Sequence, residues 1–519
     1  MNAYMLLNLS ASIVPDQEIV TFESRRQNYS QLVDNTGRLA AALAEKGIRH
    51  GDRVGLITTN CPEMVETFFA AFQLGAVVVP INYRAKSDEL AFMIQDAGVN
   101  VLIVEQRYAD LVMLLLENTG VDSAICIGEA HAIGPSMEEI KQQVEQPMLD
   151  FSDVEDDELA VLLYTSGTTS RPKGVMITHG QLTSYVMNHS EAPDGTERGS
   201  SIVCLPGYHV AGATSICNSI YSGRRLILLR QFDAEAWLFA VENEQATQAF
   251  LVPTMLKRVM DHPDFNASDL NSLTSLSYGA APMPLPVIQQ AIDLFPAATD
   301  FSNGFGLTET TSTVSVLDAE DHKLTGTKEE VEKKIKRLAS VGKPLPGVDI
   351  MILDEGGNEA ETNIVGQVYV RTGRSMKGYW NRPDASSETM VDGWVNTKDM
   401  GWLDEDGYLF LGGRSSDMII RGGENISPAE VEGVLFEHPL VADIAVIGYP
   451  SLEWGEEVMA VIVPENPEVP PEKEEIISYC RGRLSSFKRP SIIKFTHELP
   501  RTSTGKILKR KLRSEYVKQ

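Results

Sequence analysis

The sequence has few cysteines and no long hydrophobic run. Its five cysteines lie far apart and include no CxxC pair, a distribution typical of reduced thiols that argues against a zinc site. No stretch approaches the roughly 18 uncharged apolar residues needed to cross a bilayer, and residues 1–15 lack a basic start with an apolar centre. We therefore expect a cytoplasmic protein without an integral membrane segment.

Positive charge is also scarce. The 519 residues include 45 Lys and Arg against 72 Asp and Glu, which gives a formal net charge of −27. Such a charge repels phosphate backbones and argues against nucleic acid as a partner. Any anionic substrate must therefore meet positive charge that is placed locally.

Helical and strand patterns alternate from residue 30 onward. We expect Ser30 to cap a helix that ends before Gly47, because apolar residues between them recur at helical spacing. The pattern then predicts strands over 53–57, 77–79 and 101–104, separated by helices over 63–74 and 88–96. This alternation indicates a parallel sheet with helices on both faces.

Beyond residue 412 the pattern becomes that of a small α+β domain, with helices over 431–435 and 473–484 and strands over 444–446 and 459–463. A second folded unit fits the length, since a typical domain has roughly 100–200 residues. The charged stretch 320–337 suits either a contact for a phosphorylated cofactor or, more simply, a solvated surface helix.

The segment most informative about function is YTSGTTSRPKG, residues 164–174, which lies between apolar runs over 159–163 and 175–177. Its small hydroxyl side chains and glycines let backbone N–H groups converge on phosphate oxygens, and Lys173 supplies a cation at the rim. The spacing differs from that of a Walker A loop. Composition alone leaves two interpretations, a phosphate loop and a simple turn between strands.

Four further segments follow in the chain: YGAAP at 278–282, NGFGLTE at 303–309, residues 393–414, and PRTSTGK at 500–506. Together the five resemble the ordered signatures of the adenylate-forming superfamily, which includes acyl-CoA synthetases, firefly-type luciferases and peptide-synthetase adenylation domains. The resemblance spans essentially the whole chain. It implies an α/β fold: a large N-terminal domain with doubly wound sheets (1–412) and a small mobile α+β C-terminal lid (413–519), with a hinge near 414–417.

The resemblance also implies how ATP is held, with catalysis resting mainly on positioning and charge neutralisation. The loop holds the β- and γ-phosphates, Glu309 ligates Mg²⁺, and Lys506 stabilises the pentavalent phosphate. Asp399 accepts hydrogen bonds from the ribose hydroxyls, Arg414 contacts ribose or phosphate, and Phe305 stacks on adenine. The other implied nucleotide contacts are Thr165, Ser166, Gly167, Thr168, Thr169, Lys173, Gly279, Ala280, Ala281, Asn303, Gly304 and Thr308.

The chain departs from the family pattern at several positions. Ser170 and Lys398 stand where the family has glycine, Phe305 where it generally has tyrosine, and Ser416 where it commonly has Asp or Lys. Taken alone, Phe305 fits a core aromatic and Lys506 a solvated charge. Only the motifs around these two residues favour a role in binding or catalysis.

Two segments bear on the acid and on its acceptor. Residues 206–213 resemble the acyl-pocket and gate motif of fatty-acyl and aryl-CoA ligases, with His209 at the gate and no acidic residue to pair the ammonium of an amino acid. Taken alone, His209 fits a core histidine. Gly422 and Gly423 are expected to line the tunnel for CoA once the lid rotates, although a tight β-turn explains both glycines as well.

The sequence therefore predicts an ATP-dependent acyl-CoA synthetase, an AMP-forming acid-thiol ligase with Lys506, Glu309, Lys173 and His209 as catalytic residues. It forms acyl-AMP and pyrophosphate, then acyl-CoA and AMP, from a medium- or long-chain fatty acid. Three alternatives stay open: a CoA ligase for an aromatic or alicyclic acid, a luciferase-like or carrier-protein-loading adenylating enzyme, and a non-catalytic nucleotide-binding relative. ATP, CoA and Mg²⁺ are the expected cofactors, and a homodimer is compatible with the sequence.

Overall fold

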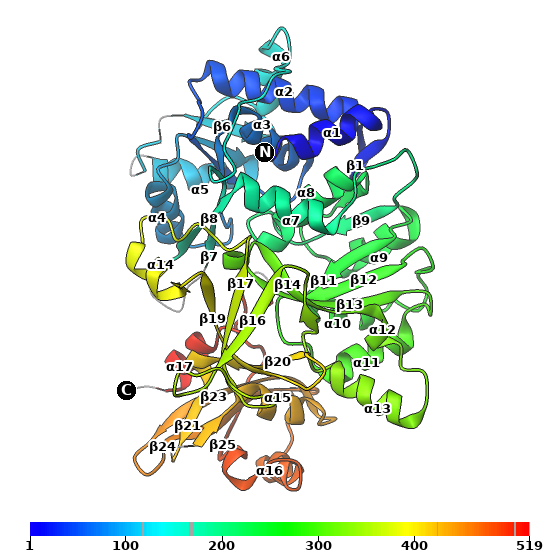
Figure 1. Cartoon of the computed structure of the whole chain (residues 1–519), viewed down its shortest axis with the longest axis vertical. Helices are drawn as coiled ribbons and strands as arrows, with labels where there is room; N and C mark the ends of the chain where they lie inside the picture. Colours follow the sequence, from blue (N-terminus) through cyan, green and yellow to red (C-terminus); the bar gives the residue numbers. More distant parts are fainter. Residues whose placement is uncertain (117–118, 122, 166–170, 423, 503–504, 518–519) are drawn as a thin grey trace.

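The computed structural model describes residues 1–116, 119–121, 123–165, 171–422, 424–502 and 505–517 (Figure 1). Within these ranges the strands form four sheets, of which two large ones and a smaller one precede residue 415. The fourth sheet lies in the C-terminal part, at the opposite end of the molecule from the N-terminus (Figure 1). The predicted fold class, a large α/β N-terminal domain and a smaller C-terminal domain, is confirmed.

The first α/β sheet contains the strands that the N-terminal pattern predicts. Its order is β6-β5-β3-β4-β7-β8, and all neighbours are parallel except β7 and β8, which form an antiparallel pair. The predicted strand over 53–57 is β3, and those over 77–79 and 101–104 lie within β4 and β5. The bounds are β3 (Arg53–Ile57), β4 (Val77–Pro80), β5 (Val101–Glu105), β6 (Ala124–Ile127), β7 (Leu159–Thr165) and β8 (Lys173–Thr178).

The second α/β sheet has the order β15-β14-β13-β12-β11-β9-β10-β1-β2, with parallel strands in the middle and antiparallel ones at both ends. Its bounds are β1 (Glu18–Phe22), β2 (Arg25–Asn28), β9 (Ser200–Val203), β10 (Arg225–Leu228), β11 (Gln248–Leu251), β12 (Ser275–Gly279), β13 (Asp300–Leu307), β14 (Ser312–Leu317) and β15 (Lys343–Pro344).

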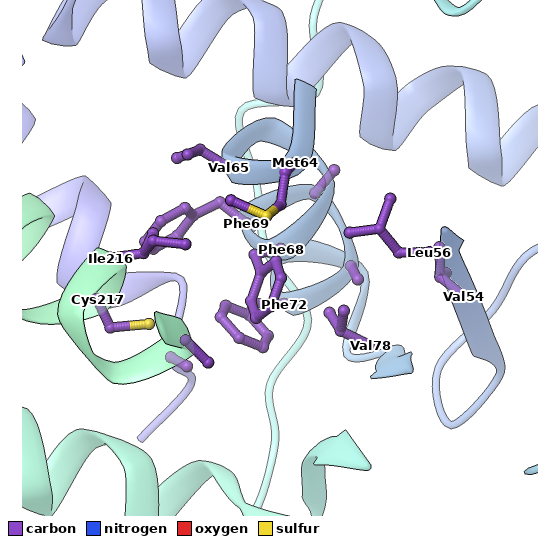
Figure 2. Packing of buried hydrophobic residues seen from close by; sticks show 14 of the residues in the cluster. Val54, Leu56, Met64, Val65, Phe68, Phe69, Phe72, Val78, Ile216 and Cys217 are labelled. Carbon is purple, nitrogen blue, oxygen red and sulfur yellow. The ribbon is translucent and has the colours of Figure 1, made fainter. Parts of the chain in front are cut away.

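Helix α3 (Pro62–Leu74) lies at the centre of the core between the two sheets (Figure 2). Pro62 stands at its first position, where a missing N–H costs nothing, and Gly75 ends it in a left-handed conformation with φ of 66°. Phe68, Phe69 and Phe72 are fully buried and pack edge to face. Helices that share this core are α1 (Met5–Ile13), α2 (Tyr29–Glu45), α6 (Met137–Gln143), α7 (His179–His189) and α8 (Val210–Ser222).

Other helices cover the outer faces of the two sheets, which makes both sheets doubly wound. Helices α4 (Ser87–Ala97) and α5 (Gln106–Leu116) cover the first sheet. Helices α9 (Ala234–Asn243), α10 (Pro253–Met260) and α11 (Leu285–Leu294) cover the second. Helices α12 (Ala319–His322) and α13 (Lys328–Arg337) follow β14. Within the charged stretch 320–337, α13 has no buried residue and is the predicted surface helix, whereas Asp321 and His322 of α12 are buried.

A third, antiparallel sheet connects the large α/β sheets to the C-terminal part. It comprises β16 (Val348–Leu353), β17 (Gly366–Thr372), β18 (Met390–Val391), β19 (Trp394–Leu403) and β20 (Leu409–Arg414), with α14 (Pro383–Thr389) beside it. The C-terminal part contains β21 (Ile419–Arg421), β22 (Glu424–Ile426), β23 (Val441–Ser451), β24 (Gly455–Pro464), β25 (Ile492–Phe495), α15 (Pro428–Phe436), α16 (Lys473–Cys480) and α17 (Lys509–Tyr516).

Two local predictions are wrong. Ser30 lies inside α2, and the cap is Asn28, whose side chain accepts a hydrogen bond from the N–H of Gln31 and whose own N–H binds the Gln31 side chain. The helix predicted over 473–484 ends at Cys480, where the carbonyl accepts hydrogen bonds from the backbone N–H groups of residues 483 and 484 and the chain turns. Among the described helices, none is both long and apolar enough to span a bilayer.

Candidate active site

The predicted phosphate loop joins β7 to β8, the antiparallel pair at the edge of the first sheet. Thr165 and Lys173 face each other at the end of this hairpin from which the loop departs. The Lys173 Nζ lies 5.0 Å from the centroid of the Tyr379 ring, a cation–π contact. The residues between them that were predicted to bind phosphate (Ser166, Gly167, Thr168 and Thr169), and the variant position Ser170, lie outside the described residues.

Tyr379 connects the hairpin to Glu309, and sequence reasoning missed it. The Tyr379 hydroxyl donates to Glu309 Oε1 at 2.7 Å, and the Glu309 carbonyl accepts from the N–H of Met376 at 2.8 Å. Burial, followed by the Glu309 charge, raises the pKa of Tyr379, so it remains a donor at neutral pH. The hairpin lysine and the predicted metal ligand therefore share one aromatic neighbour.

The predicted adenine contacts lie at the carboxyl ends of β12 and β13. Gly279 pairs with Gly304, and a Cβ on Gly279 would lie 2.2 Å from the Gly304 carbonyl oxygen, so only glycine permits this approach. Ala280, next along the chain, is exposed, and Ala281 and Thr308 are partly exposed. Phe305 is partly buried against the core of the third sheet, whereas Asn303 is buried and donates to the Ser340 carbonyl at 3.2 Å.

Asp399 and Arg414 lie opposite each other on β19 and β20, and they form an ion pair of 2.9 Å between Arg414 Nε and Asp399 Oδ1. Asp399 is 7% exposed, and among the described residues its buried Oδ2 has no hydrogen-bond partner. Burial raises the pKa of Asp399, while Arg414 and then Lys506 act in the opposite direction. A buried carboxylate oxygen without a donor fits the predicted acceptor of ribose hydroxyls.

Lys506 reaches this region from the C-terminal part of the chain. Next to it, Gly505 packs against the start of α10 so closely that a Cβ there would lie 2.5 Å from Thr254 Oγ1. Lys506 remains accessible to solvent, but the protein around it lowers its pKa through desolvation, with Arg414 acting in the same direction. The carboxylates that act in the opposite direction include Asp399 and Glu309, so Lys506 lies within their electrostatic reach.

His209 stands immediately before α8, at its N-cap position, with its ring 4.5 Å from that of Tyr208. Burial, with a smaller contribution from Arg84, lowers the pKa of His209 to about 4. The imidazole is therefore neutral at pH 7.

Gly422 is the predicted residue that lies apart from the others. It follows β21, its N–H donates to the Trp454 carbonyl at 2.7 Å, and a Cβ on it would lie 2.9 Å from Trp454 Cε3. It borders a cavity of about 440 Å³ whose lining comes entirely from the C-terminal part: Arg421, Gly422, Glu424, Trp454, Ser486 and Phe487. Gly423 lies outside the described residues.

Comparison with known proteins identifies the family. The model of the "AMP-binding enzyme" family matches residues 8–380, and that of the "AMP-binding enzyme C-terminal domain" matches residues 430–506. This chain belongs to the AMP-binding enzyme family. The predicted adenylate-forming superfamily is thereby confirmed.

Relatives of this AMP-binding enzyme cover almost its whole length. Feruloyl-CoA synthase of Amycolatopsis sp is 36% identical over 98% of this chain and 97% of its own. The long-chain-fatty-acid–CoA ligase FadD13 of Mycobacterium tuberculosis is 33% identical over 98% of this chain and 95% of its own. The anthranilate CoA ligase AuaEII, solved with anthranoyl-AMP, has a TM-score of 0.89 at 26% identity and covers 100% of this chain and 97% of its own. The predicted enzyme class, AMP-forming carboxylate–CoA ligase, is confirmed.

The departure at Lys398 has a backbone consequence. Its φ of 61° lies in the left-handed region, where glycine is unstrained and other residues pay roughly 1–2 kcal/mol. Two hydrogen bonds hold this conformation: the Lys398 N–H donates to Asn396 Oδ1 at 2.8 Å, and the Asp399 N–H donates to Thr397 Oγ1 at 3.1 Å. The Asp399 carboxylate thus keeps its buried position without the glycine.

We predict that Lys398→Gly leaves the free energy of unfolding unchanged or raises it by up to about 1 kcal/mol, because relief of the strain offsets the roughly 0.5–1 kcal/mol entropic cost of glycine. The matched change Lys336→Gly, at an exposed position of α13, should lower it by about 1 kcal/mol. Chemical denaturation followed by circular dichroism compares the two. Equal losses for both variants would contradict the strain at Lys398.

Proposed function

We propose that this AMP-binding enzyme is an ATP-dependent acyl-CoA synthetase whose substrate is an aromatic carboxylic acid. The acid attacks the α-phosphate of ATP, so that an oxygen–phosphorus bond forms and pyrophosphate leaves. The sulfur of CoA then attacks the acyl carbonyl, the thiol loses its proton to solvent, and AMP leaves. A medium- or long-chain fatty acid, the preference predicted from the sequence, is the second candidate and is favoured by the likeness to FadD13.

The observation that carries the proposal is the close packing of Gly505, next to Lys506, against Thr254 of α10, which brings this C-terminal segment to the large domain. The effect of the Asp399 and Glu309 charges on the pKa of Lys506 agrees with this placement. Adenylation brings a carboxylate against a triphosphate, and a cation close to both lowers the repulsion where it is greatest. In the proposed site Arg414 neutralises Asp399 on one oxygen, and the other oxygen is left for the ribose. Lys173 supplies positive charge beside the loop that is expected to hold the outer phosphates.

Glu309 is the proposed ligand of Mg²⁺. Its carboxylate is a hard oxygen donor of the kind this ion prefers, and the Tyr379 hydrogen bond occupies Oε1 and orients the group. Among the described residues no cluster of three or more His, Cys, Asp or Glu could hold a metal, so the ion would also rely on phosphate oxygens. When bound there, Mg²⁺ supplies charge neutralisation at the phosphates.

The second half-reaction needs a different arrangement of the C-terminal part. In this arrangement Lys506 lies within electrostatic reach of Asp399 and Glu309, whereas Gly422 borders a cavity whose described lining residues all belong to the C-terminal part. We propose that a rotation near 414–417 moves Lys506 away from the nucleotide and brings Gly422 to the large domain, which admits the pantetheine arm of CoA. Four further statements remain predictions: the domain boundary at 412, this hinge, the cytoplasmic location and a homodimer. The five cysteines are buried and unpaired, which supports a reducing compartment.

The proposed function is tested by incubating the full chain with ATP and Mg²⁺ and with one acid at a time: cinnamate, benzoate, octanoate or palmitate. Pyrophosphate and AMP release are measured with and without CoA. We expect pyrophosphate with at least one aromatic acid, and AMP turnover only when CoA is present. Turnover only with the alkyl acids would favour the second candidate, and acyl-AMP that CoA never discharges would contradict a CoA ligase.

We predict that Lys506→Ala slows acyl-AMP formation by about 10²–10³, the usual effect of losing one preorganised charge donor. Formation of acyl-CoA from supplied acyl-AMP should persist, because that step proceeds after the lysine has moved away. Lys511→Ala, an exposed lysine of the same tail, is the control and should leave both rates unchanged. Normal adenylation by Lys506→Ala would show that its proposed role is wrong.

A further inference from the structure

Arg374 is a buried cation for which the described part of the chain supplies no carboxylate. It is 4% exposed, and its Nη1 atom has no hydrogen-bond partner among the described residues. Its other contacts are long: Nη2 donates to the Thr313 carbonyl at 3.4 Å, and Nε donates to Thr372 Oγ1 at 3.5 Å. Partly buried Arg225, by contrast, pairs with Glu18 and Glu244.

Within the described part of the chain, the surroundings of Arg374 are aromatic and polar but not anionic. Its guanidinium carbon lies 5.2 Å from the centroid of the Tyr185 ring, and the ring of His189 lies 4.6 Å from Tyr185. The Tyr185 hydroxyl donates to Thr313 Oγ1 at 3.3 Å. The charge of Arg374 therefore meets the Tyr185 ring and neutral oxygens. Burying a charge without a counter-charge is costly, which points to a partner other than the described residues.

The position of this cluster relative to the site follows from β14. This strand begins at Ser312, directly after the turn that carries Glu309, and Ser312 accepts a hydrogen bond from Thr214 of α8 at 3.4 Å. Thr311 Oγ1 donates to the Arg374 carbonyl at 2.7 Å. Arg374, in the loop after β17, and Tyr185, on α7, thus lie beside β14. Both α7 and β14 contact α8, whose start carries His209.

On the proposed function, the reacting carboxylate lies near Lys506 and Glu309, and the body of the acid extends past His209 along α8 and β14. From these placements we propose that Arg374 determines specificity: it binds an oxygen acceptor at the far end of the acid, and the Tyr185 ring packs against the aromatic body of the acid. An anionic oxygen would compensate the buried charge, and a phenolic oxygen would accept a hydrogen bond from Nη1. An acid that ends in a methyl group would leave the guanidinium unpaired.

The test uses three cinnamic acids that differ only at the para position: carboxylate, hydroxyl or methyl. Acid-dependent pyrophosphate release by the full chain gives kcat/KM for each. The wild type should prefer one or both oxygen-bearing acids over the methyl acid by about 10–100-fold. Arg374→Met should remove this preference by lowering kcat/KM for the oxygen-bearing acids while sparing the methyl acid. Preference for the carboxylate or for the hydroxyl identifies which oxygen is bound.

Controls separate recognition from folding. Arg374→Lys keeps the charge but not the planar fork, and should keep part of the preference if Arg374→Met proves unstable in thermal unfolding. Arg224→Met is the matched control. Burial lowers the pKa of Arg224, and its Nε has no partner among the described residues. This variant should leave the ratio of kcat/KM between the oxygen-bearing and methyl acids unchanged. A wild type that uses the methyl acid equally well, or an equal loss for all three acids in both Arg374 variants, would overturn the proposal. Absence of pyrophosphate release with these and all other acids would instead overturn the proposed function.

Discussion

A carboxylate and a triphosphate repel each other, and a chain with a net charge of −27 adds to that repulsion everywhere except where cations are placed. The candidate site meets this constraint with a few cations drawn from distant parts of the sequence. Lys173 comes from the edge hairpin of the first sheet, Arg414 from the end of the third sheet, and Lys506 from the C-terminal part. The large fold matters for function because it brings these three elements to one place.

In the proposed mechanism the C-terminal part rotates, and the pivot lies next to Arg414. Arg414 ends β20, and the next residues, Ser415–Asp417, lead into the fourth sheet. Arg513 of α17 donates to the Ser416 carbonyl at 3.1 Å and pairs with Asp417 at 3.2 Å, so the C-terminal helix fastens this connection. A rotation here would carry Lys506 away while leaving Arg414 paired with Asp399. One connection thus links the charge that adenylation needs to the geometry that CoA needs.

The sequence predicts the fold class and the strands β3, β4 and β5 of the first sheet because these strands are short apolar runs and α3 has clear start and stop signals. It fails at Ser30 because several residues near a helix start can cap it, and Asn28 alone has a Gln at the third position beyond it. Glu309, Asp399 and Lys506 could be named from motifs, but Tyr379 and Arg374 could not. Each is partnered by residues far away in sequence, and an arginine or tyrosine beside a strand end looks like an ordinary surface side chain until burial is known.

The proposed mechanism requires two arrangements of the C-terminal part, one for each half-reaction. Its most direct test fixes this part in the arrangement seen here. A Cβ on Gly505 would lie 3.7 Å from Thr254 Cβ, within the range of a disulfide, and all five native cysteines are buried. The double variant Thr254→Cys, Gly505→Cys, once oxidised, should release one equivalent of pyrophosphate and accumulate acyl-AMP. It should form no acyl-CoA until a reductant is added. The reduced double variant is the control, because it carries the same strain at position 505, where φ is 76°. Undiminished acyl-CoA formation by the cross-linked enzyme, or loss of adenylation on oxidation alone, would contradict the account.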